Sequence, residues 1–121
     1  MRYMAVMAGV ATLLAATPAF ADDWDFILTN DTGKEVKTIE VSPTGAAKWQ
    51  PNKVDADVQK APTLKPAART TVHFSKDAEC KFDIRLTFAD DSNAVWTNIN
   101  VCDNSYVTLR YKNGAPVFAV N

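Results

Sequence analysis

The chain is poor in the side chains from which most catalytic and metal sites are built. It contains one histidine, His73, in 121 residues, which excludes most schemes that depend on paired or clustered imidazoles. His73 alternates with Val72 and Phe74, so we expect it to face solvent from a strand. The serines stand in turn-like contexts, without the G-x-S-x-G pattern of a nucleophile elbow. We therefore expect no enzymatic activity, no catalytic residue and no cofactor.

The sequence also lacks a block of charge of one sign. Lysines and arginines number 13 against 14 acidic residues, and they are scattered, whereas a nucleic-acid interface needs a clustered basic face. Asp83, Asp90, Asp91 and Asp103 do not share one end of a strand pair. Calcium requires about six converging oxygens or more. We expect solvated strand and turn carboxylates, no metal site and no nucleic-acid partner.

No apolar run is long enough to span a bilayer, which takes about 20 residues. The first residues have another pattern: Arg2 precedes a short apolar run, and Ala19-Phe20-Ala21 forms a small-x-small cleavage site. These are the three parts of a secretory signal peptide. The sequence predicts a signal peptide over residues 1–21, a periplasmic or secreted protein over 22–121, and no membrane span after cleavage.

Cysteine is limited to two residues, Cys80 and Cys102, both in the exported part, where a disulfide is expected. A simple hairpin register places the two cysteines opposite each other but sets the apolar face against asparagines. A register one residue longer pairs Phe82 with Val101 and separates the cysteines. A β-bulge within 98–101 would satisfy both demands, so we predict one there.

Helical spacing is absent after residue 21, whereas period-two alternation recurs, as expected for strands. Residues 24–28 and 36–41 alternate and are separated by the turn NDTG, so we predict that they form a hairpin, with Trp24 in the core or at its edge. Residues 42–68 contain four prolines and few apolar residues. We expect a short edge strand or a turn around 54–58 within this stretch.

The stretch ECKFDIRLTFADD is the most regular strand in the sequence. Its inward residues are predicted to be Phe82, Ile84, Leu86 and Phe88, and its outward residues Lys81, Asp83, Arg85 and Thr87. In the run that follows, Val95, Ile99 and Val101 are predicted to share the inner face, with Trp96 on the other unless the simple hairpin register holds.

The last part of the chain carries the clearest hairpin pattern, Asn113-Gly114 between two alternating runs. The resulting register sets Leu109 opposite Phe118, both apolar. Many short strands with frequent turns predict an all-β fold, an antiparallel β-sandwich that is immunoglobulin-like or small barrel-like. About 100 residues form one domain, 22–121, which we expect to be monomeric.

Three residues are candidates for binding. Trp49 stands in the polar middle segment, where an exposed tryptophan can anchor a partner, although a loop tryptophan more often closes the end of a sandwich. Asp83 and Arg85 share the outward strand face and can pair with each other or with neighbouring strands. A buried Asp83 that accepts backbone N–H groups is the alternative if the long loop covers this face. Asn30-Asp31-Thr32 fits a glycosylation acceptor, but the turn explains the same residues.

The mature chain carries FILTNDTGKEVKTIEVSP, Trp49, LKPAARTTVHF, ECKFDIRLTFADD and NVC in that order. This order resembles a group of small exported bacterial proteins, mostly uncharacterised, with an Asn-x-Thr-Gly turn, V-S-P, a tryptophan before a Leu-Gly segment, L-x-P-G and C-x-x-D…C. The matching residues are Asn30, Thr32, Gly33, Val41, Ser42, Pro43, Trp49, Leu64, Pro66, Cys80, Asp83 and Cys102. The Leu-Gly step is missing here, and Ala67 occupies the last glycine position.

The resemblance implies an exported β domain and supplies no activity. Some members of the group are labelled argininosuccinate lyase, but that enzyme is a large helical tetramer and its serine loop is absent from this sequence. We expect a non-enzymatic binding or accessory module with an unknown protein or glycan partner. Alternatives are an inhibitor of a secreted hydrolase such as a lysozyme, and a metal-binding protein.

Overall fold

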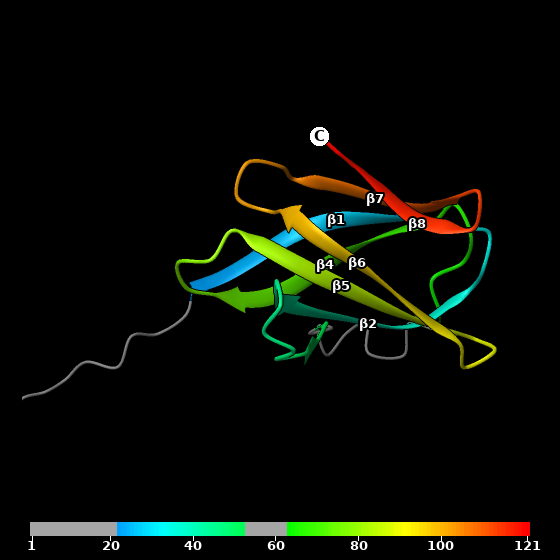
Figure 1. Ribbon diagram of the computed structural model, residues 1–121, viewed down its shortest axis with the longest axis horizontal. Coiled ribbons are helices and arrows are strands. Elements are labelled where there is room, and N and C mark those ends of the chain that lie inside the picture. Colours follow the sequence, from blue (N-terminus) through cyan, green and yellow to red (C-terminus); the bar gives the residue numbers. More distant parts are fainter. Residues whose placement is uncertain (1–21, 53–62) are drawn as a thin grey trace, which may run out of the picture.

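The computed structural model describes residues 22–52 and 63–121, which form eight strands (Figure 1). The strands are β1 (Asp22–Asp31), β2 (Val36–Pro43), β3 (Gln50–Pro51), β4 (Arg69–Lys76), β5 (Lys81–Phe88), β6 (Asn93–Asn100), β7 (Tyr106–Lys112) and β8 (Ala115–Val120). The expected all-β class is confirmed. The edge strand or turn predicted around 54–58 lies outside the described residues.

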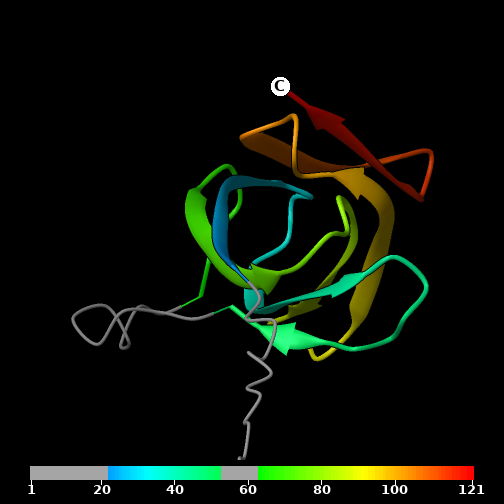
Figure 2. The same ribbon diagram turned by 90° about the vertical axis from the view of Figure 1, so that its left-hand side faces the viewer.

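Two four-stranded sheets pack together, one in the order β4-β1-β7-β8 and the other in the order β3-β2-β5-β6. The end-on view shows the strands curving around a shared interior (Figure 2). The sandwich prediction is confirmed, with one difference in strand direction. β1 pairs with β7 in parallel, so the first sheet is mixed rather than purely antiparallel.

The predicted hairpin between residues 24–28 and 36–41 is wrong. β1 pairs with β4 and β7, whereas β2 pairs with β5 and β3 in the other sheet. The NDTG turn carries the chain from one layer to the other, and the Asn30 side chain donates hydrogen bonds across this crossing, to the carbonyls of Lys34 and Leu64. Alternation correctly predicted the inward side chains, but it does not specify which strand is the neighbour.

Apolar side chains from both sheets meet between the layers. The buried set is Phe26, Leu28, Val36, Ile39, Val41, Val72, Phe74, Phe82, Ile84, Leu86, Phe88, Trp96, Ile99, Val101, Val107 and Leu109. Phe74 makes edge-to-face contacts with Phe26 and Phe82, at centroid distances of 5.6 and 5.0 Å, the arrangement that aromatic quadrupoles favour. The four inward residues predicted for β5 are all buried, and Trp24 packs at the edge of this core.

The β7–β8 hairpin has the predicted register, with Leu109 opposite Phe118. Asn113 and Gly114 both have positive φ, 54° and 81°, as a two-residue turn of this kind requires. The Asn-Gly pair was therefore sufficient to place this element.

β6 contains a bulge, but not in the register that the sequence predicted. Phe82 lies opposite Ile99 rather than Val101, and Ile84 lies opposite Trp96, so the register shifts between the two pairs. Asn98 takes a φ of 66° within this shift. The extra residue turns Trp96 and Ile99 to the same side. Trp96 is 1% exposed, so its predicted outward position is wrong.

The cysteines bridge as expected: Cys80 and Cys102 form a disulfide with a Cα–Cα distance of 5.2 Å. Val101 donates its N–H to the carbonyl of Cys80 at 2.9 Å. The register shift in β6 thus lets Trp96 and Ile99 both face the core while Cys102 still reaches Cys80.

A tight turn forms at Ala67 although glycine is absent there. Ala67 has a φ of 71°, and Ala68 donates its N–H to the carbonyl of Lys65 at 3.0 Å. The N–H of Ala67 donates to the carbonyl of Asn30 at 2.7 Å, which fixes the turn against β1. Tertiary hydrogen bonds therefore hold this alanine in a region that L residues rarely adopt.

Within 22–52 and 63–121, no helix is long and apolar enough to cross a membrane.

Candidate functional site

Trp49 and Arg85, predicted separately as binding residues, lie together on the outer face of the β3-β2-β5-β6 sheet. The Arg85 guanidinium carbon stands 4.4 Å from the centroid of the Trp49 ring, within the range of a cation–π contact. Arg85 Nε donates to Glu40 Oε1 at 2.9 Å. We call Trp49, Arg85 and Glu40 the stacked arginine cluster.

Strand register explains why these three side chains meet. Glu40 on β2 lies directly opposite Arg85 on β5, and residues opposite each other on one face have Cβ atoms close enough to interact. Ile39 and Val41 flank Glu40 and point inward, which leaves Glu40 facing out. Trp49 immediately precedes β3, whose Pro51 pairs with Glu40. Glu40 and Arg85 are thus placed by the β2–β5 ladder, and Trp49 by the short strand that follows it.

The residues after Trp49 tie this segment to the other sheet. The Gln50 side-chain amide bonds both the N–H and the carbonyl of Ser75, each at 2.9 Å. Asn52 accepts the N–H of His73 at 2.8 Å and donates to the carbonyl of Thr71 at 3.4 Å. Side-chain amides thereby bond the edge of β4, which would otherwise expose a pairing edge. Trp49 is consequently held on a segment fixed to both layers.

Asp83 is not the solvated carboxylate that the sequence favoured. It is 7% exposed and accepts hydrogen bonds from Thr44 Oγ1 at 2.9 Å, Gly45 N at 3.1 Å and Asn98 N at 3.1 Å. The turn after β2 covers it, so the alternative, a buried carboxylate that accepts backbone N–H groups, is the one observed. Asp83 and Arg85 do not pair, since Arg85 bonds Glu40.

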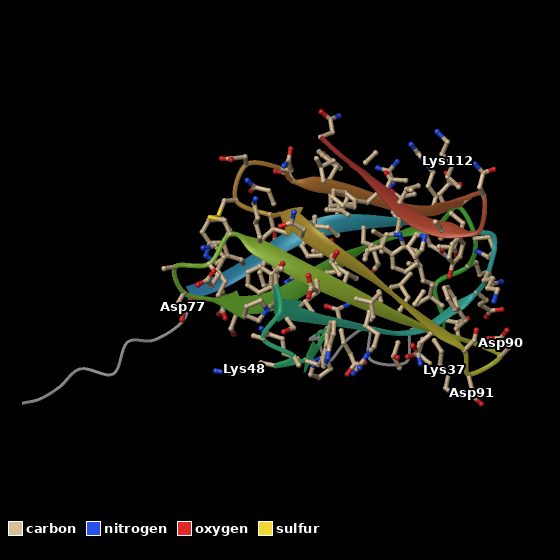
Figure 3. The ribbon with its side chains drawn as sticks, viewed as in Figure 1. Lys37, Lys48, Asp77, Asp90, Asp91 and Lys112 are labelled. Atoms are coloured by element: carbon tan, nitrogen blue, oxygen red, sulfur yellow. A yellow bond between two sulfur atoms is a disulfide. The ribbon has the colours of Figure 1, made fainter. Side chains whose placement is uncertain are left out.

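The electrostatics of the cluster favour a permanently charged guanidinium. The hydrogen bond to the Glu40 carboxylate raises the pKa of Arg85 above its ordinary value; desolvation opposes this rise, and the charge attraction of Glu40 adds a smaller contribution in the raising direction. Both side chains remain partly exposed, at 32% for Arg85 and 25% for Glu40. Lys48, beside Trp49 in sequence, projects from the β2–β3 connection (Figure 3).

The remaining candidates lie away from this cluster. Neither cysteine is free among the described residues. Over 22–52 and 63–121, no three histidine, cysteine or acidic side chains stand close enough to hold a metal ion. Asp90 and Asp91 occupy the β5–β6 turn, where they pair with Lys34 and Lys37. Figure 3 shows both acids at the tip of that turn.

Asn30 is fully buried, and its amide nitrogen donates to Lys34, Leu64 and Lys65 carbonyls. Such an amide is inaccessible to glycosylation in the folded protein, so the turn interpretation stands. Sequence reasoning missed Glu40 and Thr44. Glu40 showed the outward phase of its strand, but only the β2–β5 pairing reveals its partner.

Comparison with known proteins supplies little more. No known protein family matches the chain, and no curated protein matches it, so membership of the group that it resembles stays a prediction. A solved NMR structure of a protein from Eubacterium rectale is similar, with a TM-score of 0.49 and 18% identity. That match covers 84% of this chain and 88% of the other, and at this level it says nothing of function.

Proposed function

We propose that this protein is an exported, non-enzymatic binding or accessory module that contacts its partner through the outer face of the β3-β2-β5-β6 sheet. The observation that carries the proposal is the stacking of Trp49 on Arg85, held by Glu40. Tryptophan and arginine are the residues most enriched at the energetic centres of protein interfaces. A rigid pair of this kind loses little conformational freedom when a partner binds.

Export is part of the proposal and is supported by the disulfide. Bridged cysteines persist in oxidising compartments, such as the bacterial periplasm or the extracellular space, and are rare in the cytosol. The signal-peptide pattern of residues 1–21 points the same way.

Capture from a native periplasmic extract tests the proposal. Immobilised wild-type protein should retain a stoichiometric partner that Trp49→Leu loses by at least tenfold, whereas Arg110→Lys, on the exposed face of β7, should retain it fully. Equal retention by Trp49→Leu and the wild type would contradict the assigned surface. If the partner is a hydrolase whose activity falls on binding, the module is an inhibitor.

The non-enzymatic part has its own test. Purified protein should show no turnover toward glycan, ester, peptide or phosphate substrates. Turnover abolished by His73→Ala or Asp83→Asn, in variants that remain folded by circular dichroism, would overturn it.

A further inference from the structure

We propose that Arg85 binds a carboxylate of the partner protein through its two Nη groups, so that an aspartate or glutamate side chain is the partner's anchor. This inference rests on the proposed function and adds the chemistry of the contact. It concerns the donors of Arg85 that the cluster itself does not use.

A guanidinium carries five N–H donors in a fixed plane. Among the described residues, the hydrogen bond of Arg85 is the one from Nε to Glu40. That bond uses the Nε–H donor, and the N–H groups of Nη1 and Nη2, at the outer end of the guanidinium, stay available. This edge matches the two oxygens of a carboxylate, which it can bind through two parallel hydrogen bonds.

The surroundings of Arg85 hold that edge in one orientation. Glu40 fixes the guanidinium at Nε, and Trp49 covers one face at 4.4 Å. A free arginine side chain carries about 2 kcal/mol of rotamer entropy, and a planar, stacked guanidinium loses less of it on binding. The site therefore meets the requirement of pre-organisation, with the positive group in place before the ligand arrives.

The flanking residues favour a protein partner. Register sets Pro51 beside Glu40 and Val95 beside Arg85, so a row of Pro51, Glu40, Arg85 and Val95 crosses the sheet next to Trp49. Aromatic residues and arginine are enriched in protein interfaces, and here Trp49 and Arg85 stand beside the apolar side chains of Pro51 and Val95. The exposed ammonium of Lys48 adds positive charge near the same segment, which favours an acidic partner surface.

Benzoate and benzamide provide a matched pair of probes, because they share shape and ring but differ in the carboxylate. Titration of isotope-labelled mature protein at constant ionic strength should give saturable NMR shifts of Arg85 Nε–Hε and Trp49 Nε1–H with benzoate. Benzamide should bind at least tenfold more weakly. Arg85→Lys, which keeps the charge but loses the fork, should abolish saturation, while Arg110 Nε–Hε in the wild type should not respond.

Shifts of equal size at Arg85 and Arg110, equal binding of benzamide, or saturable binding that survives Arg85→Lys would each overturn the inference. The outcome is separable from that of the proposed function. If the extract partner still depends on Trp49 while benzoate does not bind, the module stands and the carboxylate contact fails. If benzoate binds as described but no partner depends on Trp49, the carboxylate site stands and the proposed function fails.

Discussion

The carboxylate of Asp83 on β5 accepts the backbone N–H of Asn98 on β6 at 3.1 Å, at the point where β6 carries its extra residue. A bulge leaves backbone groups without ladder partners, and here a buried side chain supplies one. The same carboxylate bonds Thr44 and Gly45 of the turn after β2. Asp83 thus ties three segments together beneath the outer face, and its purpose is structural.

Replacing Asp83 by alanine should destabilise the protein by about 2–4 kcal/mol, because buried N–H groups lose a charged acceptor. Urea denaturation followed by tryptophan fluorescence measures the change. Asp25→Ala, at an exposed position of β1, is the control and should change stability by less than about 0.5 kcal/mol. A loss below about 0.5 kcal/mol in Asp83→Ala would refute this role.

Ala67→Gly should stabilise the protein by about 0.5–1 kcal/mol. Ala67 stands at a φ of 71°, where a Cβ atom costs about 1–2 kcal/mol, and the greater freedom of glycine in the unfolded chain offsets part of the gain. Thermal unfolding gives the comparison. Ala68→Gly, one residue further on, lacks the positive φ and should destabilise, so stabilisation of both variants would contradict the explanation.

Removing the disulfide as Cys80→Ser/Cys102→Ser should lower the free energy of unfolding by roughly 3 kcal/mol in the chain-entropy account, since the bond joins residues separated by 22 positions. Chemical denaturation of oxidised, reduced and variant protein tests this. Thiol titration of the native exported protein should find no reactive thiol. Two reactive thiols would show that the bond does not form in the exported protein.

Asp90 should make the stability of the β5–β6 turn depend on pH. The Ser92 side chain, and after it the Ser92 backbone N–H, lowers the pKa of Asp90. A pKa lower in the folded state than in the unfolded state gives stability that is present above about pH 4 and lost as the pH falls through the folded value. The difference in Tm between wild type and Asp90→Asn should therefore shrink below about pH 4. Ser92→Ala should reduce the pH dependence of the wild type, and no change in it would argue against this cause.

Local alternation was enough to predict the β5 core residues and the β7–β8 register, because period and turn chemistry are short-range properties. It did not reveal that β1 pairs with β4 and β7, since strand partners far apart in sequence leave no local trace. Trp96 was misplaced for a related reason. One extra residue at Asn98 reverses which face of the sheet the preceding β6 side chains point to. No residue typical of turns marked that position in the sequence.

The candidate site was predicted in part. Trp49 and Arg85 were named from residue type and outward phase, and the structure places them in contact. Glu40, which orients the arginine, was missed because its role depends on the β2–β5 register. Asp83 shares their face but is covered by a turn whose path the sequence did not define.

Site-specific photo-crosslinking in the native periplasm tests the central claim most directly. A photoreactive residue is placed at Thr38, two residues from Glu40 on β2, or at Lys48, next to Trp49, and at Tyr106 or Arg110 on β7 of the opposite sheet; all four positions are exposed. We predict one shared adduct from Thr38 and Lys48 that disappears when Trp49→Leu is added, and none from Tyr106 or Arg110. An adduct formed only from Tyr106 and Arg110, or one that is indifferent to Trp49, would contradict the account.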